Sequence, residues 1–283
     1  MTQTTYLRIQ GEHVALELPD PSEVVVDDVL WGKVEELLTP ASWAFQCRAQ
    51  MDSVDAHRFR MGETLEEEYA ICVLAGYGVP AEVGMAAACR LREAGVFDGS
   101  GQSSEDAISS LLQQPLDVDG RRIRYRFYQT KSRYLSAGLD ALRTGRPDEG
   151  NAMAFRAWFS KLPGVGPKTS SFITRNWLGS DDVAILDIHV IRACQAFGLF
   201  APDADVSRNY FSLEDKFVRF SRALGVKASW LDAVMWDGMR LLSEDQIKEF
   251  APVSAATSKL AREVVEGGAS SPKFIEQWSL FTS

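Results

Sequence analysis

The alternation of apolar and polar residues predicts a mostly helical protein with a small strand element near its start. Residues 4–26 alternate in short runs such as Tyr6-Leu7-Arg8-Ile9, which is the two-residue period of strands. After residue 26 the apolar positions recur every three or four residues, which is the helical period. We expect helices at residues 27–38, 65–75, 81–93, around 108–112, and at 124–142, 155–162, 167–178, 187–197, 213–224 and 230–242.

Turn-forming residues divide this pattern into two regions. Thr39-Pro40 should end the first helix, and the run Gly76–Pro80 should separate the second from the third. We therefore expect residues 1–60 to form an N-terminal extension with short strands and a helix. Residues 61–283 should form the helical core.

Composition is typical of a globular cytosolic protein. The 283 residues are 46% hydrophobic and 24% charged, and the start of the chain lacks the basic and apolar segments of a signal peptide. The most apolar stretch, residues 70–81, is too short to cross a bilayer. Four cysteines lie far apart without metal-ligand spacing, so we expect reduced thiols and no metal.

The charge distribution gives two opposing indications about nucleic acid. A net charge of −9 counts against tight, non-specific binding to phosphates. However, the segment from Arg121 to Arg133 holds five arginines and a lysine with only uncharged residues between them. A local basic patch is therefore expected on an acidic protein.

The segment Leu162-Pro163-Gly164-Val165-Gly166-Pro167-Lys168 lies between two predicted helices. Gly164 and Gly166 permit a tight hairpin, and Val165 between them can plug the core. Pro167 suits the first position of the following helix, where its missing N–H costs little. Backbone N–H groups at such a helix start form a seat for phosphate. The alternative is a plain helix–turn–helix with no ligand.

A second segment, Val183-Ala184-Ile185-Leu186-Asp187-Ile188-His189-Val190, places Asp187 19 positions after Lys168. Together the two segments resemble the helix-hairpin-helix (HhH-GPD) DNA glycosylase superfamily, and their spacing is similar to its 8-oxoguanine branch. The motif covers residues 150–195, and weaker similarity extends over residues 65–245. The resemblance implies a mostly α fold of two helical subdomains, with the small N-terminal β element added, and catalysis without a cofactor.

Lys168 is the expected nucleophile. An amine at a helix N-terminus meets the positive end of the helix dipole, which disfavours its protonated form. A neutral amine can attack the sugar, expel the base and form a Schiff base, which then allows β-elimination. The alternative for Lys168 is a phosphate contact or a solvated surface charge.

Asp187 would balance positive charge on the sugar and orient or deprotonate the amine. Its alternative role, which is compatible with the first, is the N-cap of the next helix. His189 resembles the histidine of the family's Asp-x-His arrangement, which lies close to the DNA backbone. With Gly164, Val165 and Gly166 it completes the expected DNA contacts. A packing or capping role for His189 is the alternative.

The base pocket implied by the resemblance consists of Phe172, Asp232 and Trp236. Phe172 and Trp236 would stack on the two faces of an extruded base, although both suit an apolar core equally well. Phe172 replaces a cysteine of better-known members, and Asp232 replaces a glutamine. An ionised carboxylate only accepts hydrogen bonds, so Asp232 would favour a guanine-type edge over adenine. Its alternative is an exposed helix carboxylate.

The sequence departs from the family at the duplex-opening loop. Members carry an asparagine near Gly76-Tyr77-Gly78 that fills the vacated stack, whereas this chain has no asparagine between Met1 and Thr144. Tyr77 is the candidate replacement as an apolar wedge.

Three hypotheses follow from these observations. The first is a monomeric DNA glycosylase/AP lyase that removes 8-oxoguanine or a related modified guanine from DNA. The second is a glycosylase-like enzyme for another guanine-like nucleobase conjugate, as similar proteins of bacterial antiphage operons would be, with an operon-encoded protein partner. The third is a non-catalytic DNA-binding module, against which the pair Lys168 and Asp187 argues.

Overall fold

The computed structural model describes residues 1–9, 11–50, 59–76 and 78–252, and this part of the chain is mostly helical. Its eleven helices are α1 (Pro40–Ala49), α2 (Leu65–Leu74), α3 (Ala81–Glu93), α4 (Glu105–Gln113), α5 (Tyr128–Thr144), α6 (Ala152–Phe159), α7 (Pro167–Leu178), α8 (Ile188–Ala196), α9 (Val206–Ala223), α10 (Ala228–Met239) and α11 (Glu244–Phe250). The expected mostly α architecture is confirmed. The observed spans of α3 and α7 coincide with the predicted ones.

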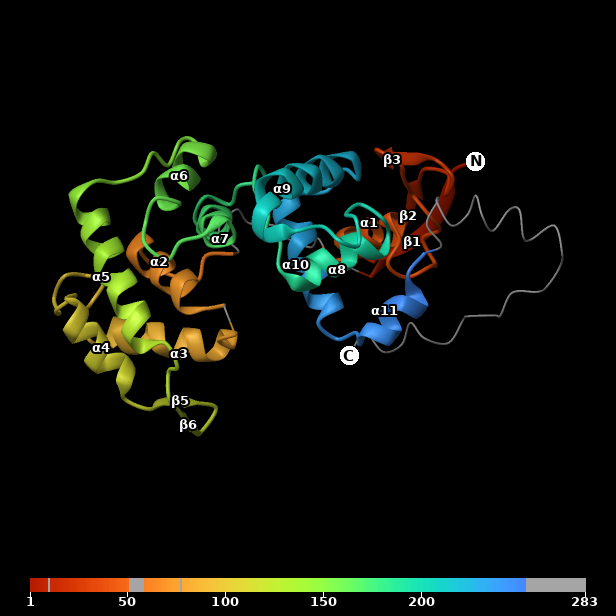
Figure 1. Cartoon of the computed structure of the whole chain (residues 1–283). Coiled ribbons are helices and arrows are strands. Elements are labelled where there is room, and N and C mark those ends of the chain that lie inside the picture. Colours follow the sequence, from red (N-terminus) through yellow and green to blue (C-terminus); the bar gives the residue numbers. More distant parts are fainter. Residues whose placement is uncertain (10, 51–58, 77, 253–283) are drawn as a thin grey trace.

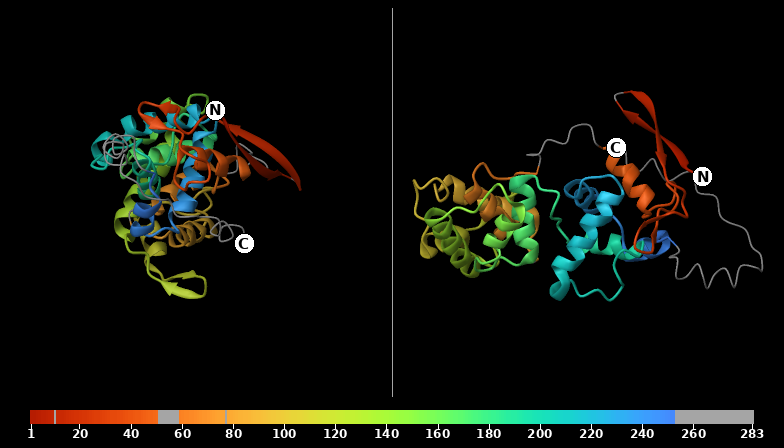
Figure 2. Two further views of the ribbon diagram at one scale, coloured as in Figure 1. Left: turned by 90° about the vertical axis from the view of Figure 1, so that its right-hand side faces the viewer. Right: turned by 90° about the horizontal axis from the view of Figure 1, so that it is seen from above.

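The strands form three antiparallel pairs within the described residues. β1 (Gln3–Ile9) pairs with β2 (Glu12–Leu18), β3 (Val24–Val26) with β4 (Val29–Leu30), and β5 (Leu116–Val118) with β6 (Arg121–Ile123). The first pair confirms the predicted strand element, and Figure 2 shows it projecting from the helices. The β5–β6 hairpin was not predicted, and it explains why α5 begins at Tyr128 rather than at residue 124.

Two hydrophobic cores divide the molecule into two lobes (Figure 1). The N/C lobe combines residues 18–47 with residues 184–239, and the middle lobe contains residues 65–177. Residues 18–47 therefore share one core with helices α8, α9 and α10. The chain passes between the lobes twice, and α7 lies on the side of the middle lobe that faces α9.

The prediction of a helix over residues 27–38 was wrong. Asp27 and Leu38 have positive φ angles of 50° and 61°, and Gly32 has a φ of +66°, all incompatible with a right-handed helix. The neighbouring valines instead form β3 and β4, as β-branched residues favour. Thr39-Pro40, the predicted stop, begins α1: Pro40 is its first residue, and the Thr39 side chain accepts a hydrogen bond from the Ser42 N–H.

Two buried carboxylates connect the lobes. Glu214 of α9 forms an ion pair with Arg156 of α6, and Asp232 of α10 forms one with Arg175 of α7. Glu214 and Asp232 are each 2% exposed. We call these the two inter-lobe ion pairs, because α6 and α7 belong to the middle lobe whereas α9 and α10 belong to the N/C lobe.

The packing of the middle lobe leaves no room for a side chain at Gly138 of α5. A Cβ atom at this position would lie 2.1 Å from the hydroxyl oxygen of Tyr69, a fully buried ring that also stacks on Phe159. Gly138→Ala should therefore lower the free energy of unfolding by about 1–3 kcal/mol, which is typical of overpacking. The melting temperature should fall with it. The intrinsic helix preference of alanine, about 1 kcal/mol, acts in the opposite direction.

Gly145→Ala is the matched control, because no atom lies within 4 Å of its Cβ position. Its effect should stay within about 0.5 kcal/mol. Equal or greater stability of Gly138→Ala than of the wild type in thermal unfolding would show that the Tyr69 contact does not constrain the helix.

Candidate active site

The predicted hairpin is present between α6 and α7. Gly164 has a φ of +75°, and a Cβ there would lie 2.0 Å from a ring carbon of Tyr134 in α5. Val165 is 7% exposed and belongs to the core of the middle lobe, so it plugs the core as expected. Gly166 is the extended N-cap of α7, and Pro167 is its first residue. The sequence thus requires glycine at 164 for both conformation and space.

Lys168 follows Pro167 in the first turn of α7, where the helix dipole acts on it. Much of its side chain is exposed, but it also lines a cavity of about 510 Å³. The cavity wall removes water from around the ammonium group, and this desolvation lowers the pKa of Lys168 below the ordinary value for lysine. The negative charge of Asp187 raises the pKa and partly opposes that shift.

The cavity brings together segments that are distant in the sequence. Cys72 comes from α2, Lys131 from α5, Phe172 from α7 and Tyr210 from α9. Gly76, from the loop predicted to enter the duplex, also lines it. The middle of that loop, Tyr77, lies outside the described residues. The cavity therefore has a mainly apolar wall with two lysines in it, Lys131 and Lys168.

Asp187 is the N-cap of α8. Its Oδ1 accepts hydrogen bonds from the N–H groups of His189 at 2.9 Å and Val190 at 3.0 Å. Within the described part of the chain, its Oδ2 has no hydrogen-bond partner. One oxygen therefore holds the helix while the other is free, so the capping role and a chemical role are compatible.

Comparison of the sequence with known protein families identifies the family of this chain. The family model for 8-oxoguanine DNA glycosylase (Ogg-HhH) matches residues 49–226, more than half of the chain. The chain belongs to the 8-oxoguanine DNA glycosylase family.

A solved glycosylase structure shares the fold of this chain. The 8-oxoguanine glycosylase/lyase of Methanocaldococcus jannaschii, in complex with a 15mer DNA containing 8-oxoguanine, matches with a TM-score of 0.50 and 19% identity, covering 71% of this chain and 98% of that one. The 8-oxoguanine DNA glycosylase of Thermotoga maritima, Tm1821, matches with a TM-score of 0.46 and 23% identity, covering 61% and 77%.

In this glycosylase-family chain, the three residues predicted for the base pocket lie in different places. Phe172 lines the Lys168 cavity, whereas Trp236 and Asp232 are not among its lining residues. Trp236 is 43% exposed and lies edge-on to His189, with 6.4 Å between ring centroids. The guanidinium of Arg240 lies 5.2 Å from the centre of the Trp236 ring. The stacking of a base between Phe172 and Trp236 stays a prediction.

Asp232 is engaged with protein groups on both oxygens. Its Oδ1 accepts from Arg175, and its Oδ2 accepts from the N–H of Ile185 at 2.8 Å. Burial raises the pKa of Asp232, while the attraction of Arg175 and the Ile185 hydrogen bond lower it. Its burial excludes the alternative of an exposed helix carboxylate, and the reading of a base edge by Asp232 stays a prediction.

His189 has a buried Nδ1 with no hydrogen-bond partner among the described residues. A contact of this histidine with a DNA phosphate stays a prediction.

Five arginines on the segment from β6 to α5 are exposed. Arg121, Arg122, Arg124, Arg126 and Arg133 have no carboxylate within ion-pair distance among the described residues. Arg133 lies 5.5 Å from the centre of the Tyr134 ring, and Tyr134 in turn contacts Gly164 of the hairpin. We call these five residues the basic surface; through Tyr134, Arg133 lies next to the hairpin that forms the candidate phosphate seat.

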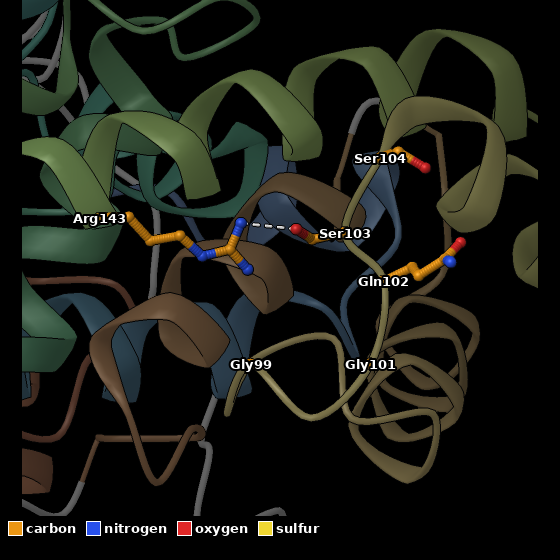
Figure 3. A pocket seen from close by; sticks show the side chains of 6 residues that line it. All are labelled: Gly99, Gly101, Gln102, Ser103, Ser104 and Arg143. Atoms are coloured by element: carbon orange, nitrogen blue, oxygen red, sulfur yellow. Dashed lines mark hydrogen bonds between the residues drawn. The ribbon is translucent and has the colours of Figure 1, made fainter.

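A separate hollow in the middle lobe lies away from these residues. Figure 3 shows it between the loop carrying Gly99 and Gly101 and the side chain of Arg143, which donates to the Ser103 hydroxyl. Lys168 and Asp187 are not among its lining residues, so it is not part of the candidate active site.

Sequence reasoning did not single out Lys131, Arg175 and Tyr210. Lys131 lines the cavity and donates to the Val73 carbonyl at 2.6 Å, and burial lowers its pKa. The only signal for Arg175 was its place seven positions after Lys168, on the same face of one helix. Nothing in the sequence indicates that Tyr210 reaches the segment before Asp187.

No helix in the described residues is long and apolar enough to span a membrane, and no group of three His, Cys, Asp or Glu in them has metal-site geometry. The four cysteines are free in the structure.

The electrostatics predict the titration of Lys168. Reductive ¹³C-methylation followed by NMR should give a pKa for Lys168 below the ordinary value for lysine. Asp187→Asn should lower the pKa of Lys168 further, because it removes the negative charge that favours the protonated amine. The electrostatic account fails if Lys168 titrates at the ordinary lysine value in both proteins.

Proposed function

We propose that this protein is a DNA glycosylase/AP lyase that removes 8-oxoguanine or a related modified guanine, with Lys168 as nucleophile and Asp187 as its assisting carboxylate. The observation that carries the proposal is the geometry around Lys168. A partly desolvated amine lies at a helix N-terminus, on a cavity, within the electrostatic influence of a carboxylate with one free oxygen. Family membership supports the same activity.

The chemistry assigns each group one task. The neutral amine of Lys168 attacks the sugar C1′, and the bond from C1′ to the base breaks with its electron pair going to the base, which takes up a proton. The free oxygen of Asp187 balances the positive charge that develops on the sugar. The amine then loses its proton, and the sugar ring opens as its oxygen gains one, which leaves a Schiff base.

The lyase step follows from that Schiff base. Loss of a proton from C2′ moves its electron pair toward the iminium group, and the 3′ phosphate leaves with the electrons of its bond to the sugar. Hydrolysis of the imine releases Lys168. The Phe172 side of the cavity is the candidate place for the extruded base, because aromatic faces stack on bases.

Borohydride trapping tests the nucleophile. Wild-type protein incubated with a labelled duplex containing 8-oxoguanine opposite cytosine should give a covalent adduct. Lys168→Gln should give none, because an amide cannot form the Schiff base. Asp187→Asn should trap roughly 10²–10⁴-fold more slowly, the range expected for loss of acid–base assistance.

Lys248→Gln is the matched control, since Lys248 is an exposed lysine paired with Asp245 on α11. An adduct that persists in Lys168→Gln would exclude Lys168 as the nucleophile. The absence of any adduct or strand cleavage with folded wild-type protein would exclude this lesion. The next substrates to test would then be other modified guanines and guanine-like conjugates outside DNA. The net charge of −9 is the reason to include such conjugates, because it counts against tight binding to DNA phosphates.

The basic surface should bind phosphates of the duplex. The double variant Arg124→Gln, Arg126→Gln should weaken binding to all duplex sequences alike. It should also reduce the slope of log K against log salt by about 1 for each phosphate that the protein no longer neutralises. Fluorescence anisotropy across a salt series measures both quantities.

The control variant Arg219→Gln, Arg222→Gln removes the same charge from arginines that pair with Asp215 and Asp182. If both double variants lower the affinity and the salt slope equally, only total charge matters and the basic surface is not a binding site.

A further inference from the structure

The segment that delivers Asp187 is held by side chains rather than by secondary structure. Residues 184–186 are neither helix nor strand, yet each of their N–H groups donates to a buried side chain. Ala184 donates to Glu214 at 3.2 Å, Ile185 to Asp232 at 2.8 Å, and Leu186 to the Tyr210 hydroxyl at 3.2 Å. The Tyr210 hydroxyl returns a hydrogen bond to the Ala184 carbonyl at 2.9 Å.

Both carboxylates that hold this segment also hold an arginine of the other lobe. Glu214 pairs with Arg156, and Asp232 pairs with Arg175 on α7, the helix whose second residue is Lys168. Each carboxylate therefore connects the backbone before Asp187 to the lobe that carries the nucleophile.

Arg175 is itself fixed from several sides. It donates to Asn176 at 2.8 Å, and Asn176 donates to Glu68 of α2 at 2.9 Å. Its guanidinium lies 3.9 Å from the centre of the Phe59 ring. A guanidinium held in this way is a rigid partner, so the position of Asp232 is set by the middle lobe.

We propose that the two inter-lobe ion pairs are positioning elements that fix the backbone of residues 184–186 and thereby hold the Asp187 carboxylate beside Lys168. This inference rests on the proposed function of Lys168 and Asp187. The alternative is that the ion pairs only stabilise the fold, as buried pairs do when neither partner is removed.

The two roles predict different results for Asp232→Asn. A positioning role predicts a roughly 10- to 100-fold lower single-turnover trapping rate at saturating abasic-site DNA, the scale expected when a reacting group is displaced. The Kd for a duplex carrying a tetrahydrofuran abasic-site analogue should change less than twofold. In the Asp187→Asn background, Asp232→Asn should slow trapping no further, because it acts through Asp187.

The control is Glu66→Gln. Glu66, which is 8% exposed, forms an ion pair with the half-exposed Arg146 inside the middle lobe and has no hydrogen bond to residues 184–186. It should lower the melting temperature without changing the trapping rate. Tyr210→Phe, which removes only the hydroxyl, is a second variant of the same segment should Asp232→Asn not fold. It should slow trapping in the same Asp187-dependent way.

The pKa of Lys168 gives a readout that needs no activity. Asp187 from α8 and Lys131 from α5 are the charged groups near Lys168, with Cys72 of α2 and Tyr210 of α9 also facing the cavity. Displacing Asp187 should lower the pKa of Lys168, so Asp232→Asn should move it toward the value in Asp187→Asn. Glu66→Gln should leave it unchanged.

The outcomes separate the inference from the proposed function. Equal effects of Asp232→Asn and Glu66→Gln on rate and pKa, or rate losses that add in the Asp187→Asn background, would overturn the positioning role. If the wild type traps on no substrate, the proposed function fails. The positioning role is then decided by the pKa of Lys168 alone, and an unchanged value in Asp232→Asn rejects it.

Discussion

A carboxylate removed from water must be paired in charge and satisfied in its hydrogen bonds, and this constraint shapes the junction between the two lobes. Glu214 and Asp232 are both almost completely buried, and burial raises the pKa of each. Each is compensated by one arginine from the middle lobe and one backbone N–H from the segment before Asp187. The hydrogen bonds that satisfy Glu214 and Asp232 therefore also help to place the candidate catalytic carboxylate of Asp187.

The same junction explains how a lysine and an aspartate from different lobes come close enough for their charges to interact. Lys168 is the second residue of α7 in the middle lobe, and Asp187 caps α8 in the N/C lobe. The chain between them is short, but its last three residues before Asp187 have no regular secondary structure to fix their direction. Hydrogen bonds from buried side chains supply that direction, which is how supporting residues commonly hold a reactive group.

The protein exposes positive charges for a nucleic-acid partner although its net charge is negative. The net charge is −9, yet the arginines of the basic surface are exposed and unpaired among the described residues, while other arginines such as Arg219 and Arg222 are paired with carboxylates. Overall charge therefore does not describe the local field that a duplex would meet at these arginines.

The sequence by itself determined the local features. Helical periodicity located most helices, the glycines and Pro167 defined the hairpin, and Asp187 was recognisable as an N-cap, because these depend on neighbours within a few positions. It misjudged residues 27–38, where turns with positive φ override an apparently helical pattern. Only the tertiary structure decided the partners of Asp232, the place of Lys131 in the cavity and the sharing of one core by residues 18–47 and 184–239. Those contacts join residues far apart in the chain, so no local pattern encodes them; they arise when buried charges and apolar faces find partners during packing.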